Sequence, residues 1–404
     1  MRILLSAFAC DPRQGSEEGV GWTWAYHLAR YGHDVCVLTR DYHRSAIEGR
    51  LGELGMPNLT FEYIGVRYVP LWIPGLGVYP YYIIWQWNAY FRAKRKHREC
   101  SYDIVHHISY GVFRNASYLY LLDIPFIFGP VGGGERSPRA LRAGMSRGGR
   151  ISEAVRDFAN LIPYIDPLWH GMLRRCARIV VRTKETLACL PKKARERTVV
   201  ALENMVSQEP HLAGESNRGV PFKLLFAGRL IALKGIPLAL KAMSLANDRI
   251  AASLTIVGKG PEEDRLKKEV RNLGLEECVE FIPWLPQPKM FEMYAAHDAV
   301  LFPSLHDSGG TVVMEAIARG RPVICLDLGG PAETVDRHCA KIVNTRGRTE
   351  EEVVRGIASA IVELAGMTQG DWEEMRRAAV RRAQYFSPER VIERVYGPLV
   401  NAKE

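Results

Sequence analysis

The feature that most constrains this 404-residue chain is an alternation of short apolar runs with helical stretches, which occurs twice. A helix after each strand returns the chain to the same end of a sheet, so neighbouring strands run parallel and helices cover both faces. The alternation lapses between Val206 and Val220, where Gln, Glu, Pro, Gly, Ser and Asn predominate. The sequence therefore predicts two doubly wound α/β domains. The expected strands are RILLSAF, DVCVLTR, LTFEYIG, DIVHHIS, PFIFG and RIVVRT before the lapse, and KLLFAGR, SLTIVGKG, CVEFIPWL, AVLFPSL, PVICLDL and AKIVNT after it.

The lapse also sets the expected domain boundaries. We expect a first domain over residues 1–205, a linker over 206–220, a second domain over 221–385 and a helix over 386–404. Two domains of this size can each bury a core of their own.

The charge is unevenly distributed along the chain. Residues 1–200 contain 28 Lys and Arg against 17 Asp and Glu, a net charge of +11, whereas the remaining residues contain 26 against 28, a net charge of −2. A basic face attracts anionic lipid, phosphorylated substrates or nucleic acid. No nucleic-acid-binding motif accompanies the charge, so we expect no nucleic-acid partner.

The cysteines and the N-terminal run indicate the compartment. The eight cysteines form no CxxC pair and no zinc spacing, which is typical of core residues in a reducing compartment. The apolar run ILLSAF is expected to be a strand and not a signal peptide. The sequence predicts a cytoplasmic protein.

An aromatic segment, YVPLWIPGLGVYPYYIIWQWNAYFRAKRKHR, spans Tyr68–Arg98. Pro and Gly interrupt it too often for it to cross a bilayer. Two interpretations are open. The aromatic side chains and the cations that follow them could rest on an anionic membrane, or the aromatics could be buried core residues before a solvated basic helix end.

In parallel sheets, ligands bind beyond the carboxyl ends of strands, so the loops after the strands are the candidate sites. DPRQGSEEGVGW after the first strand carries Gly15 and Gly19, either as a turn with a helix cap or as a loop that closes over a ligand. Its spacing is not the dinucleotide fingerprint GxGxxG. Gly133 in GPVGGGE would let backbone approach a ligand closely. His106 and His107 end a strand, where alternation would aim one of them into the cleft and the other into the core, unless both are structural.

The second half carries two charged loops. Arg229 and Lys234 in FAGRLIALKG follow a strand and precede a helix, which suits a diphosphate as well as an ordinary charged loop. In FPSLHDSGGTVVMEAIARGRPVICLDLGGPAETV, two carboxylates flank a helix start, Asp307 before it and Glu315 inside it. Asp307 could alternatively be a helix cap. An anion could bind the backbone amides at the helix start, which belong to Gly309, Gly310 and Thr311.

The order of four segments resembles a known family. GRLIALKG, LTIVGKGPEEDRL, VEFIPWLPQPKM and HDAVLFPSLHDSGGTVVMEAIARGRPVICLDLGGPAETV follow one another as in the family 4 retaining glycosyltransferases, which have the GT-B fold. The first half is similar more loosely, through its glycine loop, HLARYGHDVCVLTR and YDIVHH. The resemblance implies two doubly wound domains facing across a cleft, with the C-terminal helix crossing back to the first domain.

The resemblance also implies roles for single residues. Arg229 and Lys234 would hold the diphosphate of a nucleotide sugar, and Glu315 would bind the ribose hydroxyls. Asp307 stands where the family has Glu, and His106, His107 and Ile108 stand where it often has HxH. The glycine loop from Gly15 to Gly19 would approach the phosphates and the acceptor.

The expected function is sugar transfer from a nucleotide diphosphate sugar to an acceptor hydroxyl with retention of the anomeric configuration. Fixed cations and helix-start amides would stabilise the leaving diphosphate, so we expect neither a metal nor a cofactor. The expected acceptor is a lipid-linked saccharide or a growing surface polysaccharide, with peripheral contact to an anionic membrane through the basic first domain. The alternatives are a nucleotide-sugar epimerase of the same fold, a catalytically silent sugar-nucleotide binding protein and, last, an NAD-dependent oxidoreductase.

Overall fold

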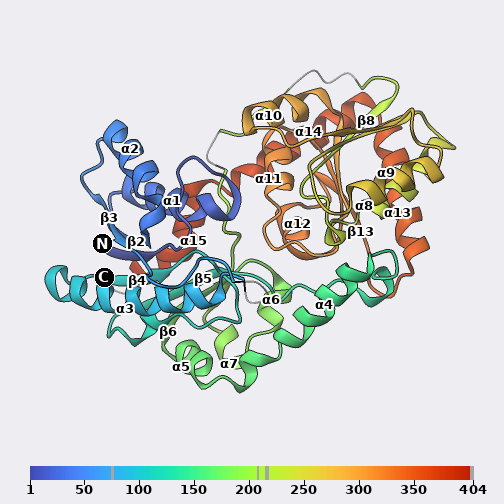
Figure 1. The fold of residues 1–404 in the computed structure, drawn as a ribbon. Helices are drawn as coiled ribbons and strands as arrows, with labels where there is room; N and C mark the ends of the chain where they lie inside the picture. The colour runs from blue at the N-terminus through green and yellow to red at the C-terminus, as the bar shows by residue number, and fades with distance from the viewer. Residues whose placement is uncertain (74–76, 207–208, 214–217, 401–404) are drawn as a thin grey trace. The chain divides into compact units, whose positions relative to one another are not determined.

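The computed structural model describes residues 1–73, 77–206, 209–213 and 218–400 (Figure 1). The chain divides into two compact units. Unit 1 comprises Met1–Gly134, Ala159–Met205 and Pro388–Glu404, and unit 2 comprises Glu135–Phe158 and Val206–Ser387. The sequence predicts that residues 1–205 form one domain, whereas Glu135–Phe158 groups with the residues of the second half. Parts of the expected linker and of the expected last helix, residues 207–208, 214–217 and 401–404, lie outside the described residues.

Unit 1 is built on a seven-stranded parallel sheet in the order β3-β2-β1-β4-β5-β6-β7. The strands are β1 (Arg2–Ser6), β2 (Asp34–Arg40), β3 (Leu59–Ile64), β4 (Ile104–His107), β5 (Phe126–Val131), β6 (Cys176–Val181) and β7 (Thr198–Val200). The helices of this unit are α1 (Ser16–Arg30), α2 (Arg44–Leu54), α3 (Tyr79–Cys100), α5 (Pro167–Arg175), α6 (Lys184–Ala188), α7 (Lys192–Arg195) and α15 (Pro388–Val400). Three single turns of 3-10 helix are η1 (Asp41–His43), η2 (Tyr118–Leu121) and η4 (Ile162–Ile165).

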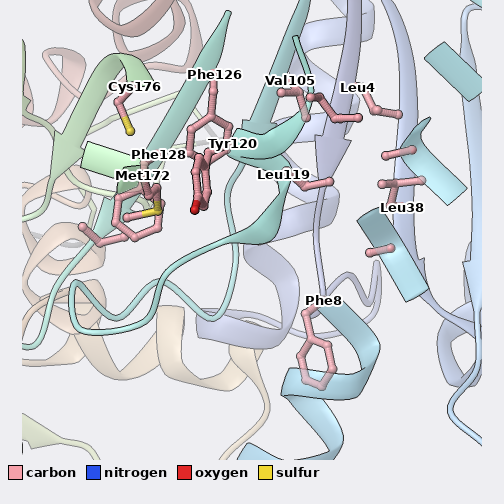
Figure 2. Close-up of a cluster of buried hydrophobic side chains, with 14 of the residues drawn as sticks. Leu4, Phe8, Leu38, Val105, Leu119, Tyr120, Phe126, Phe128, Met172 and Cys176 are labelled. Atoms are coloured by element: carbon pink, nitrogen blue, oxygen red, sulfur yellow. The ribbon is translucent and has the colours of Figure 1, made fainter. Parts of the chain in front are cut away.

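Apolar side chains cover both faces of this sheet. On one face, residues of β1, β2, β4, β5 and β6 pack against α3 and α5, and Figure 2 shows part of this cluster, including Phe8, Phe126 and Met172. On the other face, Ile3 and Leu5 pack with residues of α1 and α15. Helix α15 lies beside α1, so the last helix of the chain completes the core of the first unit (Figure 1).

Unit 2 is built on a six-stranded parallel sheet in the order β10-β9-β8-β11-β12-β13. The strands are β8 (Phe222–Ala227), β9 (Ala252–Val257), β10 (Val279–Ile282), β11 (Ala299–Phe302), β12 (Val323–Leu326) and β13 (Ala340–Val343). The helices are α4 (Arg147–Ala159, whose last residue belongs to unit 1), α8 (Ile236–Asn247), α9 (Glu263–Asn272), α10 (Gln287–Ala296), α11 (Thr311–Ala318), α12 (Gly329–Thr334), α13 (Glu350–Ala365) and α14 (Gln369–Gln384), with the 3-10 turns η3 (Arg139–Leu141) and η5 (Ala232–Lys234).

The expected fold class is confirmed. Each of the twelve expected strand segments overlaps one strand of the structure, and every strand pair of both sheets is parallel. The short strand β7 was not expected from the sequence. It pairs with β6 at the edge of the first sheet and has three residues, which are too few to show the two-residue alternation of a strand.

Candidate functional site

The charged loops of the second half follow two strands that are neighbours in the sheet. β8 pairs with β11, although 71 residues separate Ala227, the last residue of β8, from Ala299, the first residue of β11. The chain continues from β8 to β9 on one side of this pair and from β11 to β12 on the other side. In an open parallel sheet, such a reversal of strand order opens a crevice at the carboxyl ends of the two strands, where ligands bind. The loop after β8 contains Lys234, and the loop after β11 contains Asp307.

The two loops are packed backbone to backbone. The amide of Leu305 donates to the carbonyl oxygen of Leu233 at 2.8 Å, and the hydroxyl of Ser304 donates to the same oxygen at 3.2 Å. Gly235 has a φ of 64°, and a Cβ there would lie 2.0 Å from the carbonyl oxygen of Pro303. Only glycine allows this approach, so the sequence fixes the distance between the loops through one residue.

Lys234 and Asp307 form an ion pair across these loops. Their side chains are mostly buried, and Lys234 also lies over the ring of Phe302 at 5.0 Å. Burial alone would raise the pKa of Asp307, but the charge and hydrogen bond of Lys234 and the amides of Gly310 and Gly309 lower it below its ordinary value. Asp307 is therefore held as a carboxylate.

Asp307 also occupies part of the expected anion site. Its Oδ1 accepts hydrogen bonds from the amides of Gly309 and Gly310, both at 3.0 Å. We expected these amides, together with that of Thr311, to be available to a phosphate. In the structure the anion that these two amides bind is the protein's own carboxylate. Asp307 is nevertheless not the helix cap of the alternative interpretation, because the N-cap of α11 is Gly310, with no side-chain cap hydrogen bond. A phosphate can reach the first two amides only after this carboxylate moves.

Glu315 lies in α11 and is held by two residues of α10. The hydroxyl of Tyr294 donates to Oε2 at 2.9 Å, and the side-chain amide of Gln287 donates to Oε1 at 3.2 Å. Burial raises the pKa of Glu315 above its ordinary value, although both hydrogen bonds act in the opposite direction. A desolvated, oriented carboxylate of this kind is suited to accept hydrogen bonds from ligand hydroxyls.

Sequence reasoning missed Tyr294 and Gln287. They are seven residues apart, two turns of a helix, and so lie on one face of α10. That spacing could have shown that they act together, but nothing in the sequence indicated that this face meets α11.

Arg229 differs from Lys234. It follows β8 directly, it is exposed, and within the described part of the chain its side chain has no hydrogen bond or ion pair. An exposed guanidinium of this kind is available to a ligand at little cost in lost internal contacts.

The two histidines of β4 are buried on opposite faces of the sheet. His106 lies on one face of the sheet, with Nδ1 2.6 Å from the hydroxyl of Tyr396 and Nε2 2.5 Å from the carbonyl oxygen of Gly129. His107 lies on the other face, with Nε2 3.2 Å from the hydroxyl of Tyr82. Both are buried, and burial lowers the pKa of His106 to about 4 and that of His107 to about 3. The alternation of side chains along β4 does place the two histidines on opposite faces of the sheet. Both faces are covered by core residues, so both histidines pack inside the core.

The three candidate glycines of unit 1 differ in whether the backbone around them would accept another residue. A Cβ at Gly19 would lie 2.0 Å from the carbonyl oxygen of Gln14, so Gly19 allows the loop after β1 to pack against α1. Gly15 has open space around it, and Gly133 has a φ of 92°. The loop after β1 is also held by the buried Asp11, which accepts from the amide of Arg13 at 2.9 Å. These contacts favour a packed turn before the helix.

Two features of the described residues bear on ligands and membranes. They contain no cluster of three or more His, Cys, Asp or Glu side chains arranged to bind a metal ion. None of the helices in the same residues combines the length and the hydropathy needed to cross a bilayer.

Comparison with known proteins begins with the second half of the chain. Residues 208–374 match the family described as "Glycosyl transferases group 1", and this range includes Arg229, Lys234, Asp307 and Glu315. A D-inositol 3-phosphate glycosyltransferase from Pseudarthrobacter chlorophenolicus is 36% identical over 119 residues, which cover 28% of this chain and 28% of that protein. The chain therefore matches less than a third of the length of this relative.

Solved structures resemble the whole chain in fold. The lipopolysaccharide outer core galactosyltransferase WaaB in its apo form has a TM-score of 0.67 at 14% identity, with 100% of both chains covered. Anabaena Alr3699/HepE in complex with UDP-glucose has a TM-score of 0.60 at 16% identity, with 99% of this chain and 100% of that chain covered. The chain thus has the GT-B type of fold that the resemblance implied.

Proposed function

We propose that this protein is a retaining glycosyltransferase of family 4, which moves a sugar from a nucleotide diphosphate sugar to an acceptor hydroxyl. The observation that carries this proposal is the ion pair of Lys234 and Asp307 between the loops after β8 and β11. The match of residues 208–374 to glycosyltransferases supports it, as does the UDP-glucose bound by a protein of the same fold.

In the proposed reaction, the bond between the anomeric carbon and the diphosphate oxygen breaks, and the acceptor oxygen forms the new bond on the same face of the sugar. The acceptor proton passes to a phosphate oxygen of the leaving diphosphate. Negative charge grows on that diphosphate, so Lys234 and Arg229 stabilise the transition state more than the bound donor. These two cations take the place of a metal ion, and no cofactor is needed.

The carboxylates have separate roles in this proposal. Glu315 accepts hydrogen bonds from the ribose hydroxyls, held for this by Tyr294 and Gln287. Lys234 turns from Asp307 to the diphosphate when the donor binds, and Asp307 is then available to a sugar hydroxyl or to the positive charge at the anomeric carbon. The proposal keeps three glycines of unit 1 whose backbone would approach the acceptor, Gly15, Gly19 and Gly133. His106 and His107 are left out, because they are buried in the core.

The proposed acceptor is a lipid-linked saccharide or a growing surface polysaccharide, at the cytoplasmic side of an anionic membrane. Helix α3 supports this, because it divides the aromatic segment between two faces. Tyr82 and Trp85 are buried, whereas Trp87 and Phe91 are exposed, and the cations of the last two turns follow them. The buried-core interpretation applies to one face of α3, and we propose the membrane interpretation for the other. An exposed aromatic face that continues into a basic helix end suits an anionic lipid surface.

Donor screening tests the proposed reaction. The purified protein is mixed with UDP-, GDP- and ADP-glucose, and thermal unfolding is followed with and without EDTA. A donor at 100 times its Kd stabilises the folded protein by about 2.7 kcal/mol, so one of the donors should raise Tm, with EDTA making no difference. The bound donor is then supplied with lipid-linked acceptors, and the anomeric configuration of the product is read by NMR.

Each outcome of this screen decides one part of the proposal. An inverted product would overturn retention, and activity that disappears with EDTA would overturn metal independence. An isomerised donor formed without acceptor would show an epimerase, and donor binding without transfer to any acceptor would show a silent binding protein. Wild-type protein that sediments with anionic vesicles no better than a Trp87→Ser/Phe91→Ser variant would remove the membrane contact.

A further inference from the structure

Residues 135–158 belong to unit 2, although they lie between β5 and β6 of unit 1 in the chain. We call this segment the arm. It contains η3 and most of α4, and polar contacts are among those that join it to the rest of unit 2. Arg265 Nη2, for example, donates to the carbonyl oxygen of Gly144 at 2.6 Å.

Helix α4 turns its polar side inwards. Its apolar side chains Ile151, Val155 and Phe158 are 65%, 62% and 70% exposed, whereas Glu153 is 1% exposed. A helix that docked through the hydrophobic effect would show the opposite arrangement. The charged residues of α4 therefore need an explanation of their own, because burying a carboxylate is costly unless it is paired.

The partners of Glu153 include His306, the residue before Asp307. Glu153 Oε2 lies 3.5 Å from Nδ1 of His306 and accepts a hydrogen bond from the hydroxyl of Ser137, and Arg156 Nη1 donates to Oε1 at 2.6 Å. Arg156 Nη1 also lies 3.2 Å from Nδ1 of His306. On the other side of the ring, Nε2 of His306 lies 3.9 Å from a carboxylate oxygen of Glu135. Two buried carboxylates of the arm thus enclose the side chain next to Asp307.

A second contact joins the arm to the loop after β8, which carries Lys234. Gly149 lies in the first turn of α4, and a Cβ at this position would lie 2.5 Å from the Cβ of Ala232. Ala232 begins η5, the turn that ends with Lys234. Gly148, one residue earlier, has no atom within 4 Å of the equivalent Cβ position. The arm therefore packs on this turn through Gly149 and leaves Gly148 in open space.

We propose that the arm positions the nucleotide-sugar site, with Gly149 and Glu153 as its positioning residues. It contacts Ala232, two residues before Lys234, and His306, one residue before Asp307, and so holds in place the two loops that carry these charged residues. This inference rests on the proposed function. It concerns residues that lie outside the two loops and reach the donor only through them.

The neighbouring glycines provide a matched test. Gly148→Ala and Gly149→Ala both replace a helical glycine by alanine and add the same helix propensity, but only the second places a methyl group against Ala232. We expect Gly149→Ala to raise the KM for the donor about tenfold with a smaller change in the KM for the acceptor, because the methyl group displaces the turn that carries Lys234 and weakens donor binding. Gly148→Ala should match the wild type. The double variant Gly149→Ala/Ala232→Gly removes the clashing methyl group and should restore the donor KM, with Ala232→Gly as its control.

Amide hydrogen exchange gives a second readout that needs no activity. Peptides covering residues 228–235 and 303–310 should exchange faster in Gly149→Ala than in Gly148→Ala, and the same loops should loosen in Glu153→Gln. Equal exchange and equal donor KM in the two alanine variants would overturn the inference. Loosened loops in a protein that binds and transfers no nucleotide sugar would instead overturn the proposed function and leave the role of the arm in shaping these loops intact.

Discussion

The two parallel sheets reverse their strand order in the same way but place different chemistry at that point. In unit 2 the loops after β8 and β11 bring Lys234 and Asp307 together. In unit 1 the equivalent strands are β1 and β4, and β4 ends in two histidines that are buried in the cores on either face. A shared topology thus defines where a ligand can bind, whereas the loop residues decide whether a charged site forms there.

The largest expected effect tests the charged loop of unit 2. Lys234→Ala removes the cation that, under the proposed function, stabilises the leaving diphosphate, and we expect kcat/KM for the donor to fall by about two to three orders of magnitude. Arg229→Ala should reduce it in the same direction. Lys223 is an exposed lysine at the opposite end of β8, so Lys223→Ala is the matched control and should leave kcat/KM unchanged. Steady-state kinetics with the identified donor measure all three, and wild-type turnover in Lys234→Ala would refute the assignment.

The next effect concerns Glu315, where activity and stability should change in opposite directions. Glu315→Gln should raise the donor KM by about tenfold, because a carboxylate accepts from hydroxyls more strongly than an amide. Burial raises the pKa of Glu315, so its ionised form destabilises the folded protein above that raised pKa. The variant should therefore unfold about 2 °C higher at pH 7. This advantage should disappear near pH 4, where the carboxyl is protonated in both states, and calorimetry at the two pH values would show it.

Glu153 should show the opposite dependence on pH. Burial alone would raise its pKa, but the hydrogen bonds and charges of His306, Ser137 and Arg156 lower it to about 2. A lowered carboxyl pKa stabilises the folded protein above the ordinary carboxyl pKa, and this contribution is lost as the pH falls towards 2. Glu153→Gln should lower the free energy of unfolding at pH 7 by on the order of 2 kcal/mol, with little difference from the wild type near pH 2. A constant difference over that range in urea titrations would contradict the ion-pair explanation.

The smallest effect on activity is expected at the histidines of unit 1. His107→Phe removes a side chain that contacts Tyr82 inside an aromatic cluster, so kcat/KM should change by less than about threefold while stability falls by about 1 kcal/mol. A loss of activity as large as that of Lys234→Ala, without unfolding, would return the histidine to the catalytic set and remove the contrast between the sheets.

Much of the fold could be predicted because strand and helix periodicities are local. The apolar runs around Leu4 and Leu225 identify strands in parallel sheets, and the parallel pairing places the loops after them at one edge. The proximity of the Lys234 and Asp307 loops follows from neighbouring strands.

The rest depends on contacts that no local pattern encodes. The burial of His106 needs α15, which comes from the far end of the chain and supplies Tyr396. The hydrogen bonds from Gly309 and Gly310 to Asp307 depend on the backbone path of the loop. The docking of α4 reverses the usual rule that the apolar face is buried, so its apolar pattern does not indicate which side packs.

The arm has a consequence for how the molecule can be divided. Because unit 2 includes Glu135–Phe158, the polypeptide passes from one unit to the other four times, after Gly134, Phe158, Met205 and Ser387. A recombinant fragment of residues 206–387 would lack Glu153 and would leave His306 without its carboxylates. Chimeras that exchange the second half between related proteins therefore need to transplant the arm together with it.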